Sequence, residues 1–124
     1  MPEYIPGTCN IGPNEIRMRQ SLAWVCLLVT LGLSAYLYML PSRESRLIVF
    51  LPSFVTAVLF LQSAFSFCVH YGFQGVFNVQ SSLGKTDTIE QAEFRQRDRL
   101  TAIRILAGSA VIAVVFTTLF YLIP

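Results

Sequence analysis

The hydrophobic residues of this chain gather in three long runs that short polar segments separate. Two runs without a charge extend over Ser21 to Leu40 and Leu47 to Val69, and a third extends over Ile105 to Ile123. Because a helix rises about 1.5 Å per residue, about twenty residues cross a hydrocarbon core about 30 Å thick. The pattern therefore predicts an all-α integral membrane protein with three transmembrane helices.

The polar and helix-breaking residues divide this single membrane domain, residues 1–124, into segments. We expect an irregular tail at 1–12, a first span at 13–40, a second at 47–71, a loop at 72–87, a cytoplasmic helix at 88–104 and a third span at 105–123. Two prolines and two glycines exclude a regular helix from the tail, whereas Pro13 suits a first helical turn. Nothing between Thr88 and Leu122 demands a break, so the cytoplasmic helix is expected to extend the third span.

The basic residues are distributed unequally between the two sides of such a bundle. The side of the tail carries Arg17, Arg19, Lys85, Arg95, Arg97, Arg99 and Arg104, and the opposite side carries Arg43 and Arg46. Basic residues are enriched in cytoplasmic segments of membrane proteins. We therefore expect a multi-pass membrane protein with its N-terminus in the cytoplasm and its C-terminus outside.

Composition agrees with the membrane assignment and excludes one class of partner. The chain is 54% hydrophobic, its mean hydropathy is +0.58 and its net charge is +2. Nothing in this balance provides the basic patch that a nucleic-acid-binding protein needs. The expected partners are the lipid bilayer and other membrane protein subunits or a second copy of the chain.

Small and polar residues within the spans are candidates for helix packing, because helices in lipid associate through close approach and hydrogen bonds. Gln62 is the most polar side chain deep in a span, and we expect it to bond to a helix or a partner. On the second span, Ser63 and Ser66 should share a face with His70. In the third span, Ser109 and Ala113 recur at helical spacing.

The sequence offers little catalytic chemistry. The three uncharged runs within the spans contain no Asp, Glu or Lys, which speaks against an ion-coupled transporter. The single histidine has no carboxylate close by on its face, so a hydrolytic triad is not available. Glu15 and Arg19 are spaced for a surface pair on the first helical turns, worth a few tenths of a kcal/mol. We expect no enzymatic activity, and the sequence requires no cofactor.

One group of residues keeps a binding alternative open. Cys68 and His70 lie two residues apart at the end of the second span, and Cys9 in the tail can reach the same depth. Cysteine and histidine are common ligands of soft and borderline metals. We favour the structural interpretation, in which buried cysteines are small apolar residues and His70 bonds a carbonyl or headgroup.

Short motifs also carry a resemblance. The chain has Thr8-Cys9-Asn10-Ile11-Gly12, then Leu61-Gln62-Ser63-Ala64 leading to Phe67-Cys68, then Gly75-Val76-Phe77-Asn78. In these motifs it resembles uncharacterised small bacterial membrane proteins with a CNI start, a Q-A…C helix and a G-x-x-N turn. It differs from them in having Ser66-Phe67 where they have a basic residue before the cysteine. The resemblance implies an inner-membrane protein and carries no catalytic residue.

These observations favour a non-catalytic accessory or structural subunit of a larger membrane complex, an energy-converting complex among them. Two alternatives remain. One is a metal-binding or thiol redox module at the cytoplasmic interface, formed by Cys9, Cys68 and His70. The other is a homo-oligomeric channel or small transporter with Gln62 and the serines lining a pore.

Overall fold

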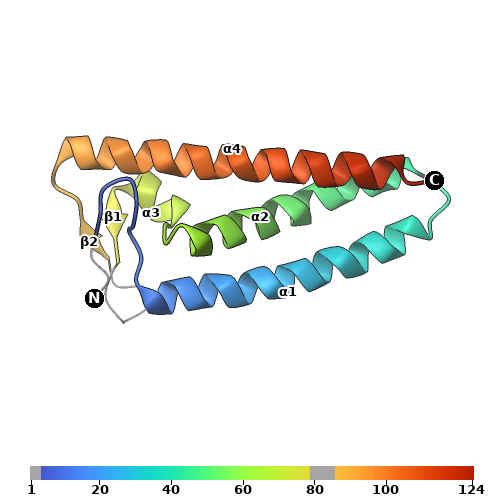
Figure 1. Cartoon of the computed structure of the whole chain (residues 1–124), viewed down its shortest axis with the longest axis horizontal. Coiled ribbons are helices and arrows are strands. Elements are labelled where there is room, and N and C mark those ends of the chain that lie inside the picture. The colour runs from blue at the N-terminus through green and yellow to red at the C-terminus, as the bar shows by residue number, and fades with distance from the viewer. Residues whose placement is uncertain (1–3, 79–85) are drawn as a thin grey trace.

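The computed structural model describes residues 4–78 and 86–124 of the chain. In chain order the elements are α1 (Pro13–Tyr38), the 3-10 helix η1 (Glu44–Val49), α2 (Phe50–Ala64), α3 (Val69–Gln74), β1 (Val76–Phe77), β2 (Asp87–Thr88) and α4 (Ala92–Leu122). The three long helices lie side by side, with α2 between α1 and α4 (Figure 1). The tail, α3 and the strands gather at one end, which we call the tail end.

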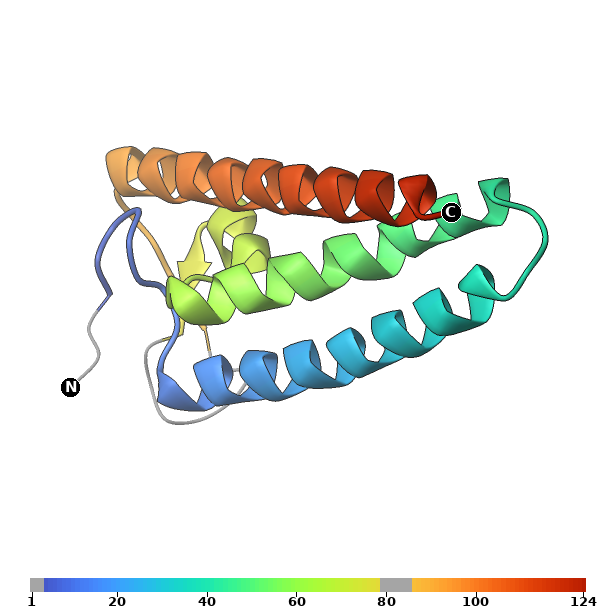
Figure 2. The same ribbon diagram turned by 45° about the vertical axis from the view of Figure 1, so that its right-hand side comes forward.

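The central helix α2 packs against both of its neighbours, and the view in Figure 2 shows the same order. At the tail end the hydrophobic core contains Phe67, Val69, Ala102 and Ile105. At the opposite end a second cluster joins Leu37, Val49 and Phe120. The bundle is therefore held at both ends by apolar contacts and in the middle by small residues.

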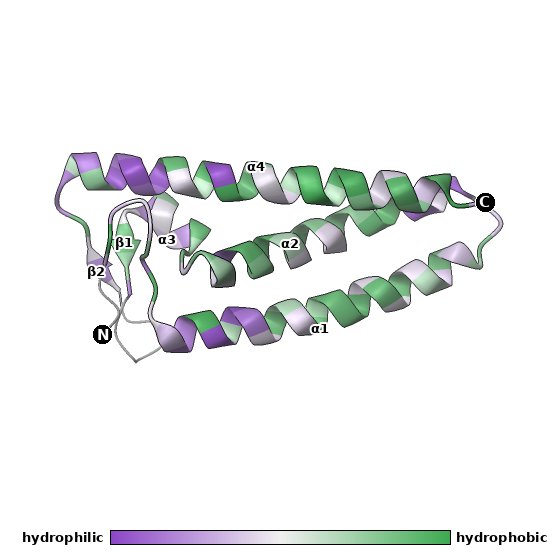
Figure 3. Cartoon of the chain, viewed as in Figure 1, coloured by the Kyte–Doolittle hydropathy of each residue, from purple (hydrophilic) through white to green (hydrophobic). Residues whose placement is uncertain are grey.

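Three helical segments are long and apolar enough to cross a membrane, namely Pro13–Tyr38, Glu44–Ala64 and Ala92–Leu122. Figure 3 shows that the hydrophilic residues gather at the tail end, in the first turns of α1 and α4 and around the strands. The prediction of a mainly helical chain with three helices of transmembrane length is confirmed at this level.

The second predicted span, 47–71, is wrong as a continuous helix, because α2 ends at Ala64. Ser66 has a φ of 53°, in the left-handed region, and the Phe67 N–H donates to the Gln62 carbonyl at 3.0 Å. A left-handed residue followed by such a bond is the usual way in which a helix stops, although glycine normally occupies that position. The chain then turns and starts α3.

Two glycines allow the chain to fold back after this turn. A Cβ atom on Gly72 would lie 2.9 Å from Phe67 Cε1 and 3.1 Å from the Asp98 carbonyl oxygen, so α3 approaches α4 closely there. Gly75 ends α3 with a φ of 73°. Part of the expected loop 72–87 is thus helix and strand, with β1 antiparallel to β2. Residues 79–85, Lys85 among them, lie outside the described residues.

The third predicted span and its extension form one helix, α4, which begins at Ala92 and not at residue 88. Thr88 lies in β2, where it pairs with Val76 of β1, so it cannot begin the helix. At the other end, Arg46 of η1 donates to the Phe120 and Ile123 carbonyls. A cation suits the negative end of the helix dipole, so Arg46 fixes the C-terminus of α4.

Candidate functional site

The tail end holds a buried group of polar side chains, which we call the polar cluster. It comprises Asn10, Glu15, Arg19, Cys68, Tyr71 and Asn78. They come from the tail, α1, the turn after α2, α3 and the residue that follows β1. Segments far apart in the sequence therefore meet in one hydrogen-bond network.

Asn10 connects the tail to the turn between α2 and α3. Its Oδ1 accepts from the Cys68 N–H at 2.6 Å, and its Nδ2 donates to the Cys68 carbonyl at 3.1 Å. The backbone of Asn10 also accepts from the Asn78 N–H, and the Gly12 N–H donates to the Asn78 carbonyl. The tail is thereby paired like a short strand against both segments.

Glu15 and Arg19 form an ion pair on the inner face of α1, with side-chain exposures of 3% and 10%. The expectation of an exposed pair is wrong, because α3 and the segment after β1 cover the first turns of α1. Tyr71 Oη and Asn78 Nδ2 donate to Glu15 Oε1 at 3.3 and 3.2 Å. Burial and the adjacent Glu15 charge raise the pKa of the Tyr71 hydroxyl.

Arg19 also contacts Cys68, with Nη2 donating to Sγ at 2.9 Å. Its side chain therefore spans Glu15 on one side and the cysteine on the other. A guanidinium presents several donors in a fixed plane, which suits two acceptors at once. Cys68, at 2% exposure, is held by Arg19 through its side chain and by Asn10 through its backbone.

A second contact holds the start of the tail against α4. Asp98 Oδ1 accepts from the Gly7 N–H at 2.7 Å and Oδ2 accepts from Tyr4 Oη at 2.8 Å. Thr101 Oγ1 donates to the Gly7 carbonyl at 2.6 Å. Burial and the nearby Asp98 raise the pKa of the Tyr4 hydroxyl, so it stays protonated and keeps donating.

These contacts define what the polar cluster can do chemically. Both oxygens of Glu15 accept hydrogen bonds, and Arg19 is committed to two acceptors. A general acid, a base or a metal ligand needs a position open to the substrate or the ion. The cluster instead satisfies its polar groups internally, which is the arrangement of a structural network.

The structure does not assemble the metal or thiol candidates into a group. His70 is exposed on α3, whereas Cys68 is buried beside Arg19 and Cys9 is half-buried in the tail. In the described part of the chain, no three Cys, His, Asp or Glu residues are placed to hold a metal ion. All three cysteines are free thiols.

The helix-packing candidates on α4 are buried inside the bundle, whereas those at the end of α2 are not arranged as expected. Ser109 and Ala113 are fully buried in α4. Ser63 donates to the Phe60 carbonyl of its own helix. Because α2 ends at Ala64, Ser66 and His70 do not share a face with Ser63, and that expectation is wrong.

Gln62 is buried, but its hydrogen bond stays within the same segment of the chain. Its Oε1 accepts from the Val69 N–H at 2.9 Å, across the break between α2 and α3. The first amides of a helix have no intrahelical acceptor, so this bond satisfies one of them. Gln62 thus bridges the turn and does not connect two spanning helices.

Sequence reasoning assigned no such role to several residues of these networks, Asn10, Asn78, Tyr71 and Asp98 among them. A signal existed for two of them, because Asn10 and Asn78 belong to the CNI and G-x-x-N motifs. The three motifs, distant in sequence, meet through Asn10, Cys68 and Asn78. Asp98 carried no such signal, since it lies in a run of charged residues that reads as a solvated helix.

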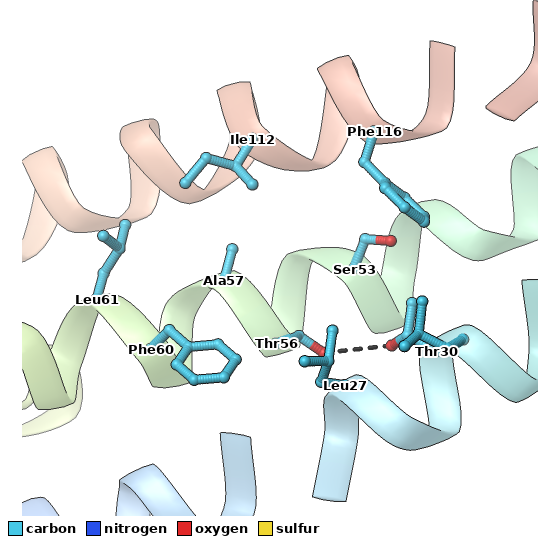
Figure 4. A pocket seen from close by; sticks show the side chains of 10 residues that line it. Leu27, Thr30, Ser53, Thr56, Ala57, Phe60, Leu61, Ile112 and Phe116 are labelled. Atoms are coloured by element: carbon cyan, nitrogen blue, oxygen red, sulfur yellow. Dashed lines mark hydrogen bonds between the residues drawn. The ribbon is translucent and has the colours of Figure 1, made fainter. Parts of the chain in front are cut away.

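A groove runs over α2 where α1 and α4 flank it without closing on each other, and we call it the α2 groove. Its volume is about 290 Å³. The floor contains Ser53, Thr56 and Ala57, and the wall on α4 includes Ile112 and Phe116 (Figure 4). Leu31 of α1 also lines the groove. The groove therefore combines a floor of small residues with apolar walls.

Among the described residues that line the α2 groove, the polar side-chain groups are all hydroxyls. Thr30 Oγ1 and Thr56 Oγ1 lie 3.2 Å apart and join α1 to α2, as the dashed line in Figure 4 shows. Ser53 is 7% exposed, and its buried Oγ has no hydrogen-bond partner among the described residues. A buried hydroxyl without a partner costs free energy, so this one can gain from an added donor or acceptor.

Comparisons with known proteins add no family to this description. No family model, no curated protein and no solved structure matches the chain. The geometry of the polar cluster and of the α2 groove is therefore the basis for any functional conclusion.

Proposed function

We propose that this chain is a three-span membrane protein that acts as a non-catalytic accessory subunit, and that the α2 groove receives a transmembrane helix of another polypeptide. The α2 groove carries the proposal, because small residues form its floor between two apolar walls. Helices in lipid pack closely where small residues allow their backbones to approach.

The unpartnered hydroxyl of Ser53 favours a protein helix over a lipid chain as the occupant. An acyl chain offers no hydrogen-bonding group, whereas a helix with a serine, threonine or amide side chain can bond to Ser53 Oγ. Ser53 and Ala57 are four residues apart, so they form a small-xxx-small pair on the floor. This spacing supports close contact with one helix.

The exposed faces of the chain speak against a second copy as the occupant. At the depth of the α2 groove, α1 presents Val25, Leu28 and Val29, and α4 presents Val114 and Val115. These are branched side chains, whereas Ser34, Ser109 and Ala113 are already buried inside the bundle. The free faces carry mostly branched side chains, with Gly32, Ala35 and Ala107 as exposed small positions, and we propose a different polypeptide as the occupant.

The proposed orientation has the tail end in the cytoplasm. The described arginines at that end are Arg17, Arg19, Arg95, Arg97, Arg99 and Arg104, against Arg43 and Arg46 at the other. This asymmetry supports a cytoplasmic N-terminus and an outer C-terminus. The inner membrane remains the proposed location. In this orientation the polar cluster anchors the cytoplasmic ends of the helices.

Photo-crosslinking from two neighbouring positions tests the proposal. A photoreactive residue replaces Leu31, on the wall of the α2 groove, or Leu28, which is exposed outside it. In native membranes, Leu31 should yield an adduct with another membrane protein, and Leu28 should yield lipid adducts. Mass spectrometry of the adduct identifies the occupant.

The other outcomes contradict the proposal in different ways. An adduct of the chain with itself at Leu31 would support the homo-oligomeric channel. Lipid adducts alone at both positions would show that the α2 groove receives no protein. Equal protein adducts at Leu28 and Leu31 would show that contact is not specific to the groove.

A further inference from the structure

A second groove lies between the tail and the facing parts of α2 and α4, and we call it the tail groove. Its volume is about 500 Å³. Gly7 and Thr8 of the tail border one end together with Arg104. Leu61, Gly108 and Ile112 continue it along the bundle, away from the tail. The tail groove therefore has a polar end beside the tail and an apolar part, lined by Leu61, Gly108 and Ile112, which extends along the helix axes. We call this part the apolar body.

Arg104 is the last charged residue of α4, and the rest of that helix is uncharged. It is exposed, and it forms no ion pair or hydrogen bond with any residue that the structure describes. A basic side chain at the start of an uncharged helical run belongs at the height of lipid headgroups. Its charge is thus available to an anion at this height.

The apolar body extends from that position into the membrane-spanning part of the bundle. From Arg104 to Ile112 the helix rises about 12 Å, most of the thickness of one leaflet, which is about 15 Å of hydrocarbon. Gly108 has no side chain to fill the space between α4 and Leu61 of α2. The opening is therefore long and apolar, as an acyl chain requires.

We propose that the tail groove binds a phospholipid with an anionic headgroup, whose phosphate contacts Arg104 and whose acyl chain lies over Gly108 toward Ile112. A free phosphate would use Arg104 alone, whereas a lipid uses the charge and the apolar body together. A zwitterionic lipid would fill the body, but the positive group of its headgroup would offset the attraction of Arg104. Such a lipid would tie the tail to the bundle at the membrane surface.

Native mass spectrometry of the purified full-length chain tests this proposal, with phosphatidylglycerol, phosphatidylcholine of the same acyl chains, and glycerol phosphate as probes. The wild type should bind phosphatidylglycerol about tenfold more tightly than phosphatidylcholine and should not retain glycerol phosphate. Arg104→Gln should remove this preference. Arg99→Gln is the matched control, because Arg99 is exposed on another face of the same helix.

A second pair of variants tests the apolar body. A Cβ atom at Gly108 would lie 3.6 Å from Leu61 Cδ1, an ordinary contact, so Gly108→Ala should still bind lipid. Gly108→Leu should lower the affinity for both lipids by about tenfold. If this variant does not fold, the comparison of Arg104→Gln with Arg99→Gln decides.

Four results would overturn the proposal. They are equal affinity of the wild type for the two lipids, an unchanged preference in Arg104→Gln, the same loss in Arg99→Gln, and retention of glycerol phosphate as strong as that of the lipid. Because purified protein is used, this outcome is independent of whether a helix occupies the α2 groove.

Discussion

The side-chain amide of Asn10 bonds both backbone groups of Cys68, accepting from its N–H at 2.6 Å and donating to its carbonyl at 3.1 Å. A residue of a neighbouring β-strand makes the same pair of bonds. Cys68 lies in the break between α2 and α3, where the backbone has left one helix and not yet entered the next. Buried backbone groups need partners. The tail is therefore a structural part of the bundle, because it completes the hydrogen bonds of the break.

Replacing Asn10 by alanine should destabilise the fold strongly. The substitution leaves the N–H of Cys68 buried without its partner, at a cost of about 1–3 kcal/mol, whereas the Cys68 carbonyl still accepts from the Gly72 N–H at 2.9 Å. The free energy of unfolding in mild detergent, measured by circular dichroism, should fall by about 1–3 kcal/mol. The exposed Gln20→Ala is the control and should change it by less than about 0.5 kcal/mol. Equal effects of the two variants would contradict the role of Asn10.

Two Glu–Arg pairs among the described residues offer a matched comparison. Glu15–Arg19 is buried, whereas Glu93–Arg97 has the same spacing with side-chain exposures of 70% and 55%. Removing one partner of a buried pair leaves an uncompensated charge, so Glu15→Gln or Arg19→Met should each cost about 3 kcal/mol. The exposed pair should show a coupling below about 0.5 kcal/mol.

A double-mutant cycle for each pair measures this difference. The variant with both Glu15→Gln and Arg19→Met should be more stable than the sum of the single effects predicts, because no isolated charge remains. Similar coupling energies in the two cycles would show that Glu15 and Arg19 are not buried as described.

Features that depend on neighbouring residues were predicted from the sequence, whereas features that depend on residues distant in sequence were not. The uncharged runs predicted three helices of transmembrane length, because hydrophobicity over twenty residues is a local property. The burial of Glu15 and Arg19 depends on Tyr71 and Asn78, which lie more than fifty residues away. Spacing alone indicated the pair but not its environment.

The break after α2 was missed for a different reason. A left-handed helix stop is normally marked by glycine, and this chain has Ser66 there. The run Leu47 to Val69 therefore contains no charged residue, and it has no glycine or proline near its end that would mark the break. The hydrogen bonds that stabilise the break, from the Val69 N–H to Gln62 and from the Cys68 N–H to Asn10, form only in the folded chain.

Ser66→Gly tests the cost of this unmarked stop. A residue with a Cβ atom in the left-handed region is disfavoured by roughly 1–2 kcal/mol, and glycine recovers that cost less its greater unfolded-state entropy. We expect the thermal midpoint to rise, with a gain in the free energy of unfolding of up to about 1 kcal/mol. Ser63→Gly, within α2, should instead lower it by up to about 1 kcal/mol. A loss in Ser66→Gly would contradict the left-handed turn.

Alkylation of Cys9 provides a test by pH. Burial raises the pKa of its thiol, and the thiolate is the form that reacts. With iodoacetamide, Cys9 of the folded protein should react more slowly than Cys9 of the protein unfolded in SDS, most clearly near pH 8. The difference should narrow as the pH rises through the raised pKa. Mass spectrometry of the alkylated peptide measures both rates.

The same samples test the thiol alternative. Treatment with a mild oxidant should leave Cys9 and Cys68 unlinked, because Cys68 is buried against Arg19. An oxidant-dependent bond between them, or equal reactivity of Cys9 in the folded and unfolded protein, would favour a redox role over a structural one.

The most direct test of the accessory role is the size of the native complex after the walls of the α2 groove are trimmed. Leu27→Ala with Leu31→Ala removes apolar contacts from the α2 groove without touching the tail groove, and Leu28→Ala with Val111→Ala removes similar exposed residues outside it. Native gel electrophoresis of mildly solubilised membranes should show loss of the large complex in the first variant and retention in the second, with both chains folded. A complex of unchanged size in the first variant, or equal loss in both, would contradict the proposal that the α2 groove receives a partner helix.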